Sequence, residues 1–191
     1  MSQSRKVIDA LSYKINPNDK FFIDSSIFLP FLDANYDRDD KSKDLQRKAQ
    51  SFFKNIMAKH AKIYILPELL SECYNRYIHN LHEKAGGKEI IDYKAYRKTE
   101  ECKQFVESFK LQLSQLLEEK VVEFDSFKLE TEDIDNFFKV FNKIDFNDYL
   151  FMKYAKSKGL IFITNDKDFS ISFDNLKLVL SLNKTLIGRP Y

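Results

Sequence analysis

The sequence has few of the residues that mark several special classes of protein. Its two cysteines, Cys73 and Cys102, are too few for a disulfide framework, and their spacing fits no zinc site. We therefore expect both to be reduced thiols, as is usual in the cytosol. Only four glycines and four prolines occur among 191 residues, which argues against long low-complexity linkers.

Long apolar runs and an excess of one charge are also absent. No stretch approaches the roughly 18 apolar residues of a membrane span, and the first 20 residues lack the apolar core of a signal peptide. We therefore expect a soluble cytoplasmic protein without membrane association. The 31 Lys and Arg nearly balance 29 Asp and Glu. This balance alone does not indicate nucleic-acid binding, because phosphate binding depends on where basic side chains cluster.

Apolar and aromatic side chains, by contrast, are abundant. They make up 43% of the chain, with 18 Phe and 10 Tyr, which is ample for a core. Short apolar runs alternate with longer segments of helical period, as in a parallel sheet with connecting helices. The pattern predicts a helix over residues 7–15, and the chain length suits a single domain over residues 1–191. We expect five strands, at residues 21–24, 63–66, 121–124, 160–164 and 176–180.

Local signals predict where several helices begin and end. Pro67 suits a first helical turn, where its missing N–H is not needed. Thr131, followed by two acids, is typical of another helix start. Asp145, with Asp148 three residues later, resembles a capped start, and Gly159 is a plausible stop for that helix.

A long charged segment at about residues 80–119 is predicted to form a helical insertion that Gly86 and Gly87 break into two helices. Its basic residues alternate with tyrosines, a pattern that can bind RNA through phosphates and stacked bases. The same pattern also fits a solvated helix face with mixed charges, or an arm that binds a protein partner or a second copy of the chain. The candidate substrate-binding residues are Lys94, Arg97 and Lys98.

Four acids follow predicted strands or open the helix after them: Asp24, Glu72, Asp148 and Asp166. Each has an ordinary explanation alone, as a helix cap, a solvated helix residue or a turn residue. Together they can converge at one edge of a parallel sheet, where open α/β sheets build their sites. Crowded carboxylates raise one another's pKa unless a cation compensates. Hard ions such as Mg²⁺ or Mn²⁺ prefer oxygen ligands of this kind.

The segments that carry these acids resemble PIN domains, a nuclease fold of toxin–antitoxin ribonucleases and of RNA-processing enzymes. The segments are FFIDSSIFL, LPELLSECYNRYI and DFNDYLFMKYAKSKGLIFITNDKDF, and the third is the most specific. The resemblance runs from about residue 20 to residue 183. It implies a three-layer α/β/α sandwich around a parallel sheet of about five strands, and RNA cleavage that depends on Mg²⁺ or Mn²⁺.

The resemblance also implies roles for individual residues. Asp24, Glu72, Asp148 and Asp166 match the catalytic and metal-binding acids, and Asp168 matches a further acid that we rank lower. Ser26 and Thr164 match small hydroxyl residues that support the ligands. No histidine lies in these motifs, so a metal rather than an imidazole must lower the pKa of the attacking water.

The partners that follow are an RNA substrate and, for a toxin, a small antitoxin protein; a homodimer is also consistent with the resemblance. A non-catalytic RNA- or protein-binding module is the main alternative, and metal-dependent cleavage separates the two. A phosphohydrolase with an aspartyl nucleophile is disfavoured, because Asp24 is followed by Ser25 and Ser26 rather than by the Asp-x-Asp pattern.

Overall fold

A computed structural model describes residues 5–32, 40–167 and 176–190. Its centre is a six-stranded sheet in the order β1-β6-β5-β2-β3-β4, in which every pair of neighbouring strands is parallel. Parallel neighbours require crossover connections, and helices supply most of them here. The strands are β1 (Ile8–Asp9), β2 (Lys20–Ile23), β3 (Lys62–Ile65), β4 (Val122–Phe124), β5 (Ile161–Ile163) and β6 (Leu178–Ser181).

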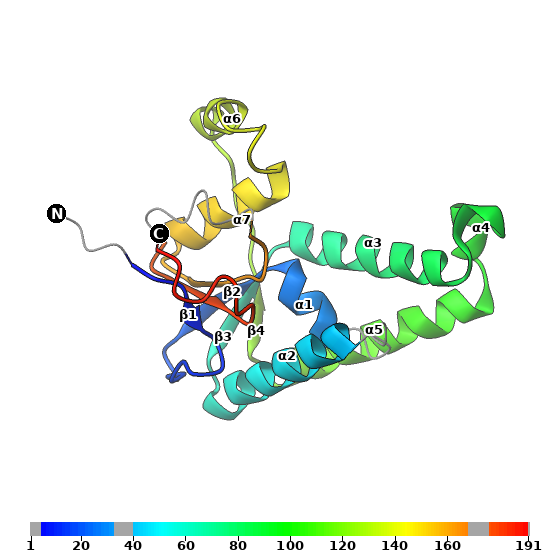
Figure 1. Cartoon of the computed structure of the whole chain (residues 1–191), viewed down its shortest axis with the longest axis horizontal. Helices are drawn as coiled ribbons and strands as arrows, with labels where there is room; N and C mark the ends of the chain where they lie inside the picture. The colour runs from blue at the N-terminus through cyan, green and yellow to red at the C-terminus, as the bar shows by residue number, and fades with distance from the viewer. Residues whose placement is uncertain (1–4, 33–39, 168–175, 191) are drawn as a thin grey trace.

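The helices cover the sheet and extend beyond it (Figure 1). They are α1 (Ser25–Leu32), α2 (Asp40–Lys59), α3 (Pro67–Lys84), α4 (Tyr93–Tyr96), α5 (Glu100–Glu118), α6 (Thr131–Phe138) and α7 (Phe146–Ser157), with a 3₁₀ turn at Gly87–Glu89. None of the helices in the described ranges is both long enough and apolar enough to cross a bilayer.

The five predicted strands are confirmed to within two residues, but the predicted helix at residues 7–15 is wrong. This segment instead forms β1, in which Ile8 lies opposite Leu180 of β6. The amide N–H of Ala10 also donates to the carbonyl of Ser181 (2.9 Å). Pairing with residues about 170 positions away overrode the local helical pattern, and local sequence contains no sign of such a partner.

Two adjacent phenylalanines of β2 show how the layers form. Successive side chains of a strand point to opposite faces. Phe21 packs edge-on against Phe52 of α2, with ring centroids 5.9 Å apart, whereas Phe22 packs against Phe151 and Tyr154 of α7. Helices α2 and α7 therefore cover opposite faces of the sheet, which gives the expected α/β/α layering.

Helices α3, α4 and α5, which we call the arm, extend away from the sheet (Figure 1). Helices α3 and α5 lie side by side, and the rings of Tyr77 and Phe109 pack between them at 5.2 Å. Helix α3 ends at Lys84, just before the predicted break. Gly86 and Gly87 have φ angles of 99° and 61°, a left-handed conformation that other residues adopt at a cost.

Candidate active site

Asp24 lies between the end of β2 and the start of α1 and is 2% exposed. Its Oδ2 accepts hydrogen bonds from the hydroxyls of Ser26 (2.5 Å) and Thr164 (2.9 Å), and a longer one from the Ser26 amide (3.3 Å). Burial raises the pKa of Asp24, the hydrogen bonds from Ser26 and Thr164 partly offset that rise, and the charge of Glu72 adds to it. A buried carboxylate is therefore held in one orientation.

The segment that follows β5 also packs against Asp24. The hydroxyl of Thr164, which donates to Asp24, also accepts the amide N–H of Asp166 (2.9 Å). The amide of Asn165 donates to the hydroxyl of Ser26 (3.0 Å). Strands β2 and β5 are neighbours in the sheet, so these bonds join the carboxyl ends of adjacent strands. Asp168 lies outside the described residues.

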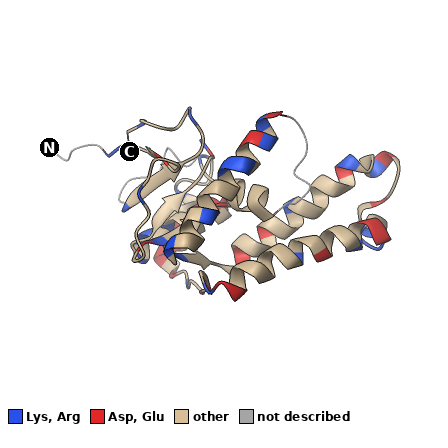
Figure 2. Cartoon of the chain, turned by 90° about the horizontal axis from the view of Figure 1, so that it is seen from below, with Lys and Arg blue, Asp and Glu red and all other residues tan. Residues whose placement is uncertain are grey.

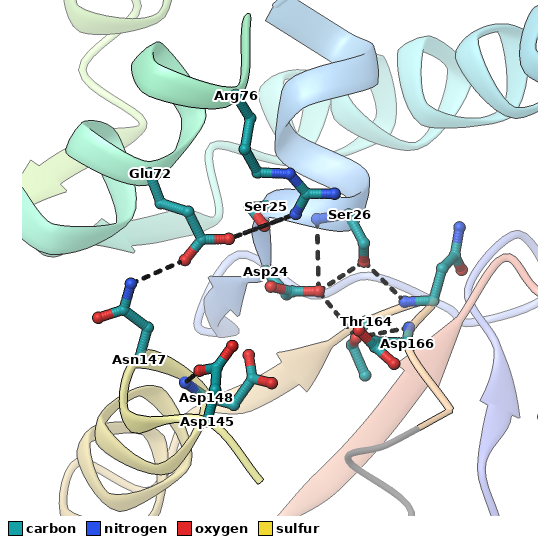
Figure 3. Close-up of polar contacts among 11 residues, drawn as sticks. Asp24, Ser25, Ser26, Glu72, Arg76, Asp145, Asn147, Asp148, Thr164 and Asp166 are labelled. Atoms are coloured by element: carbon teal, nitrogen blue, oxygen red, sulfur yellow. Dashed lines mark hydrogen bonds and ion pairs between the residues drawn. The ribbon is translucent and has the colours of Figure 1, made fainter. Parts of the chain in front are cut away.

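Glu72 projects from the second turn of α3, and polar groups of three helices surround it (Figure 3). Its Oε1 accepts from the hydroxyl of Ser25 (2.5 Å) and lies 3.3 Å from Nη1 of Arg76. Its Oε2 accepts from the side-chain amide of Asn147 in α7 (3.2 Å). Nη1 of Arg76 also donates to Ser25 (2.8 Å). The network holds the Glu72 carboxylate between α1, α3 and α7.

Asp148 lies in the first turn of α7 and is not itself the helix cap. The cap is Asp145, whose Oδ1 accepts the Asp148 amide N–H (2.9 Å). Burial, together with the charges of four nearby acids, raises the pKa of Asp148 to about 8. In order of effect, those acids are Asp145, Asp24, Asp166 and Glu72. The charges of the other three predicted acids therefore all act on Asp148.

The donor set fits a hard divalent cation in its chemistry. Carboxylate oxygens are the ligands that Mg²⁺ and Mn²⁺ prefer, and crowded acids with raised pKa values are stabilised by positive charge. Figure 3 shows the side chains of Asp24, Glu72 and Asp148 directed toward the same space. Within the ranges that the structure covers, no three Asp, Glu, His or Cys side chains converge closely enough to form a ready-made ligand cage.

Several polar neighbours of the acids were not predicted from the sequence. Ser25, Arg76 and Asn147 position Glu72, although only Ser26 was singled out from the first motif. One of them had a recognisable signal: Arg76 follows Glu72 by four residues, the spacing of an ion pair on a helix. Asn147 had no such signal in the sequence, because it lies 75 positions from Glu72, its hydrogen-bond partner.

The predicted substrate-binding residues lie far from the acids. Lys94 is in α4, and Arg97 and Lys98 follow it, at the distal end of the arm (Figure 1). Twelve residues of α3 separate Glu72 from the end of that helix at Lys84, which corresponds to about 18 Å at 1.5 Å per residue. Their role in substrate binding remains a prediction, and an RNA that contacts both regions must span this distance.

Comparison with known families identifies the fold. The family model of the PIN domain matches residues 21–171, which include every strand of the sheet from β2 to β5 and all four acids. The chain belongs to the PIN-domain family. Proteins of this family are generally nucleases and typically use divalent metals. The predicted family membership is therefore confirmed.

A solved structure supports the same fold for this PIN domain. The crystal structure of PAE2754 from Pyrobaculum aerophilum aligns with 88% of this chain and 87% of its own, at 15% sequence identity and a TM-score of 0.50. At this identity the likeness concerns the fold alone. No curated protein matches the sequence.

Proposed function

We propose that this PIN domain is an endoribonuclease that hydrolyses RNA phosphodiester bonds with Mg²⁺ or Mn²⁺ as cofactor. The observation that carries the proposal is a buried group of acids, in which burial first and neighbouring carboxylates second raise the pKa of Asp148 to about 8 and also raise the pKa of Asp24. Such an arrangement destabilises the ionised acids when no cation is bound. Groups with strongly raised pKa values are concentrated at functional sites.

In this proposal, Asp24, Asp148 and Asp166 hold the cation directly or through water, and Glu72 completes the shell or orients the attacking water. A bound divalent ion would lower the pKa of that water and stabilise the negative charge that develops on the phosphate. Asp24 is suited to its role because its Oδ2 accepts three hydrogen bonds from Ser26 and Thr164, which fix the direction of the other oxygen.

Arg76 has a distinct part in the proposal. Its guanidinium is bound to Glu72 and Ser25, yet its side chain is 55% exposed. It therefore lies at the edge of the acidic site, where a positive charge attracts a phosphate group that the carboxylates would otherwise repel. We propose that it orients Glu72 and helps the RNA backbone approach.

A non-catalytic protein would have no evident need for the buried carboxyl group of Asp24. An ionised carboxylate that is 2% exposed and has a pKa raised by burial and by the charge of Glu72 costs stability, and an amide would satisfy Ser26 and Thr164 equally well. A bound cation would compensate the negative charge of the buried Asp24 carboxylate, which packing alone cannot do. The chemistry therefore favours an enzyme.

Cleavage of a labelled mixed-sequence single-stranded RNA tests the proposal. We expect purified protein to cleave with Mn²⁺ or Mg²⁺, to stop in EDTA, and to lose at least about 100-fold in rate on Asp24→Asn. The matched control is Glu107→Gln, which removes an exposed acid of the arm that pairs with Lys110. DNA of the same sequence, tested in parallel, defines the substrate class.

Two outcomes would contradict the proposal. Cleavage that persists in EDTA or in Asp24→Asn would come from a different site or a different protein. A folded protein that binds RNA but cleaves under none of these conditions would be a binding module.

The toxin role is a finer prediction and needs its own test. We expect a toxin to arrest growth when it is expressed and Asp24→Asn to relieve the arrest. An RNA-processing enzyme would be tolerated in both forms. Sedimentation of the purified protein tests the predicted homodimer, and co-expression with a neighbouring small protein tests the predicted antitoxin.

A further inference from the structure

A group of aromatic rings connects α6 to the start of α7. The ring of Phe137 lies 5.5 Å from Phe138 in the same helix and 5.1 Å from Phe146, the first residue of α7. It also packs at 5.6 Å against Tyr149 of α7. Contact between the rings is therefore continuous from one helix to the other. We call Phe137, Phe138 and Phe146, together with Phe141 three residues after Phe138 in the following turn, the phenylalanine patch.

Three members of the patch are unusually exposed. Phe138 is 64% exposed, Phe141 is 63% exposed in the turn after α6, and Phe146 is 40% exposed. Phenylalanine normally contributes to a core, and a cluster of exposed apolar side chains typically marks a binding surface. Phe137 packs into the molecule and leaves its neighbours on the surface.

Helix α6 is held firmly enough to present these rings. Glu130 and Asp133 form a capping box at its start, and the side chain of Asp133 pairs with Lys153 of α7 (2.6 Å). That ion pair lowers the pKa of Asp133 and raises the pKa of Lys153. The rings of Phe137 and Phe146 add a second connection between the helices. A surface fixed in this way loses little conformational entropy when a ligand binds.

Basic side chains accompany the rings. Lys139 follows Phe138 directly, and Lys143 lies two residues after Phe141. A pocket between α6 and α7 is lined by Lys139, Lys153 and Lys156 over apolar walls that include Tyr149. The acids of α6 lie mostly at its start, where Asp133 is already paired. Aromatic rings with interleaved lysines are the combination that binds single-stranded nucleic acid.

The patch leads directly to the acidic site. Phe146 is the first residue of α7, and its neighbour Asp145 caps the helix that carries Asp148. Asn147, the next residue, donates to Glu72. The patch therefore borders the turn of α7 that carries Asn147 and Asp148.

We propose that the phenylalanine patch binds the bases of single-stranded RNA by stacking, while Lys139 and Lys143 contact its phosphates and the strand continues toward Asp148. The inference rests on the proposed function, because it assigns to the patch the binding of the RNA that the same site would cleave. Paired bases are stacked on one another and do not offer their faces, so duplex RNA should bind weakly.

Binding of a fluorescent single-stranded RNA, followed by anisotropy, tests the patch. The Asp24→Asn background with Mg²⁺ separates binding from cleavage. We expect Phe138→Ala and Phe141→Ala to weaken binding by about tenfold each. The matched control is Phe124→Ala, which removes a ring that is 52% exposed at the edge strand β4. Because the two patch rings are more than 60% exposed, their removal should leave the fold intact, which circular dichroism checks.

Two further ligands sharpen the test. An RNA of the same length that carries abasic positions should bind weakly and should not distinguish Phe138→Ala from the parent protein. Lys139→Gln with Lys143→Gln should reduce the salt dependence of binding, because fewer counterions are released.

Affinity for single-stranded RNA that is unchanged in both patch variants would overturn the inference. Failure of the inference differs from failure of the proposed function. If the patch variants bind and cleave RNA as well as the parent protein does, the inference is wrong and the proposed nuclease stands. If RNA binding depends on the patch but no metal-dependent cleavage occurs, the proposed nuclease is wrong and the patch still binds RNA.

Discussion

The acidic site and the arm contain the same types of charged side chain in opposite situations. In the site, Asp24 and Glu72 are bonded to groups 47 to 140 positions away, and burial raises the pKa of Asp24. In the arm, Lys103 pairs with Glu100 and Lys110 with Glu107, each three residues apart and well exposed. Both signs of charge are spread along the long helices (Figure 2).

The difference shows that the position of a charged side chain in the fold, rather than its residue type, determines whether it forms an exposed local pair or is buried among distant partners. An exposed pair within a helix stabilises it by about 0.3–0.5 kcal/mol. The acids at the strand ends destabilise one another, and we propose that they recover this energy when a cation binds.

Two threonines give the sharpest comparison. Thr164 donates to Asp24 and accepts from the Asp166 amide, whereas Thr99 caps α5 by accepting from the Cys102 amide (3.2 Å). Replacing either with valine keeps the shape and removes the hydroxyl. We expect Thr164→Val to lower the cleavage rate about 10- to 100-fold, because Asp24 and Asp166 lose their orientation.

Thr99→Val is the control for this substitution. We expect it to cost about 1 kcal/mol of stability through the lost cap and to leave cleavage unchanged. Kinetics together with chemical denaturation measure both effects. Equal rates for Thr164→Val and the parent protein would show that the hydroxyl network does not support catalysis.

The raised pKa of Asp148 predicts an effect of intermediate size on stability. Its pKa is 3.8 when unperturbed and about 8 in the fold, so between these values the native state binds more protons than the unfolded state. Stability without metal should therefore fall as pH rises from about 4 to about 8, and level off above. Asp24, whose pKa is also raised, contributes in the same direction.

Cation binding requires ionised acids, so added Mn²⁺ should raise the melting temperature more at pH 8 than at pH 6. Thermal melts with and without Mn²⁺ across this range measure both trends. Asp148→Asn should flatten the pH dependence, and Glu107→Gln in the arm should not. An unchanged pH profile in Asp148→Asn would show that this residue is not the titrating group.

Two buried tyrosines give the smallest expected effects. The hydroxyl of Tyr96 in the arm is buried without a hydrogen-bond partner among the described residues, and burial raises its pKa to about 12. Tyr154, in α7 on the sheet, donates to Asp125 (2.9 Å). We expect Tyr96→Phe to be neutral or stabilising, and Tyr154→Phe to cost about 1 kcal/mol.

Urea denaturation of both variants makes this comparison. A loss of about 1 kcal/mol in Tyr96→Phe as well would mean that its hydroxyl has a partner in solution, such as an ordered water.

Much of the fold could be predicted because its signals are local. Ile161–Ile163 is buried and apolar on both faces, as predicted for a central strand, and Asp145 caps α7 as its spacing indicates. The edge strand β1 could not be found in this way. It consists of two residues, and its identity depends on β6 at the other end of the chain.

The candidate site was likewise predictable from the sequence in part. The spacing of Asp24, Glu72, Asp148 and Asp166 suggested convergence, because the ends of parallel strands share an edge. The sequence could not show that Arg76 and Ser25 both bind Glu72. The exposure of Phe138 and Phe141 was also hidden, since their apolar pattern resembles that of a buried helix face.

By itself, the sequence determined the alternation of strands and helices, the helix starts at Pro67 and Thr131, and the four acids beside the strand ends, because these depend on neighbouring residues. Only the tertiary structure decided which groups hold Glu72, how deeply Asp24 is buried and how far Lys94 lies from the acids. Burial and long-range contact arise when distant segments pack, and no local pattern specifies them.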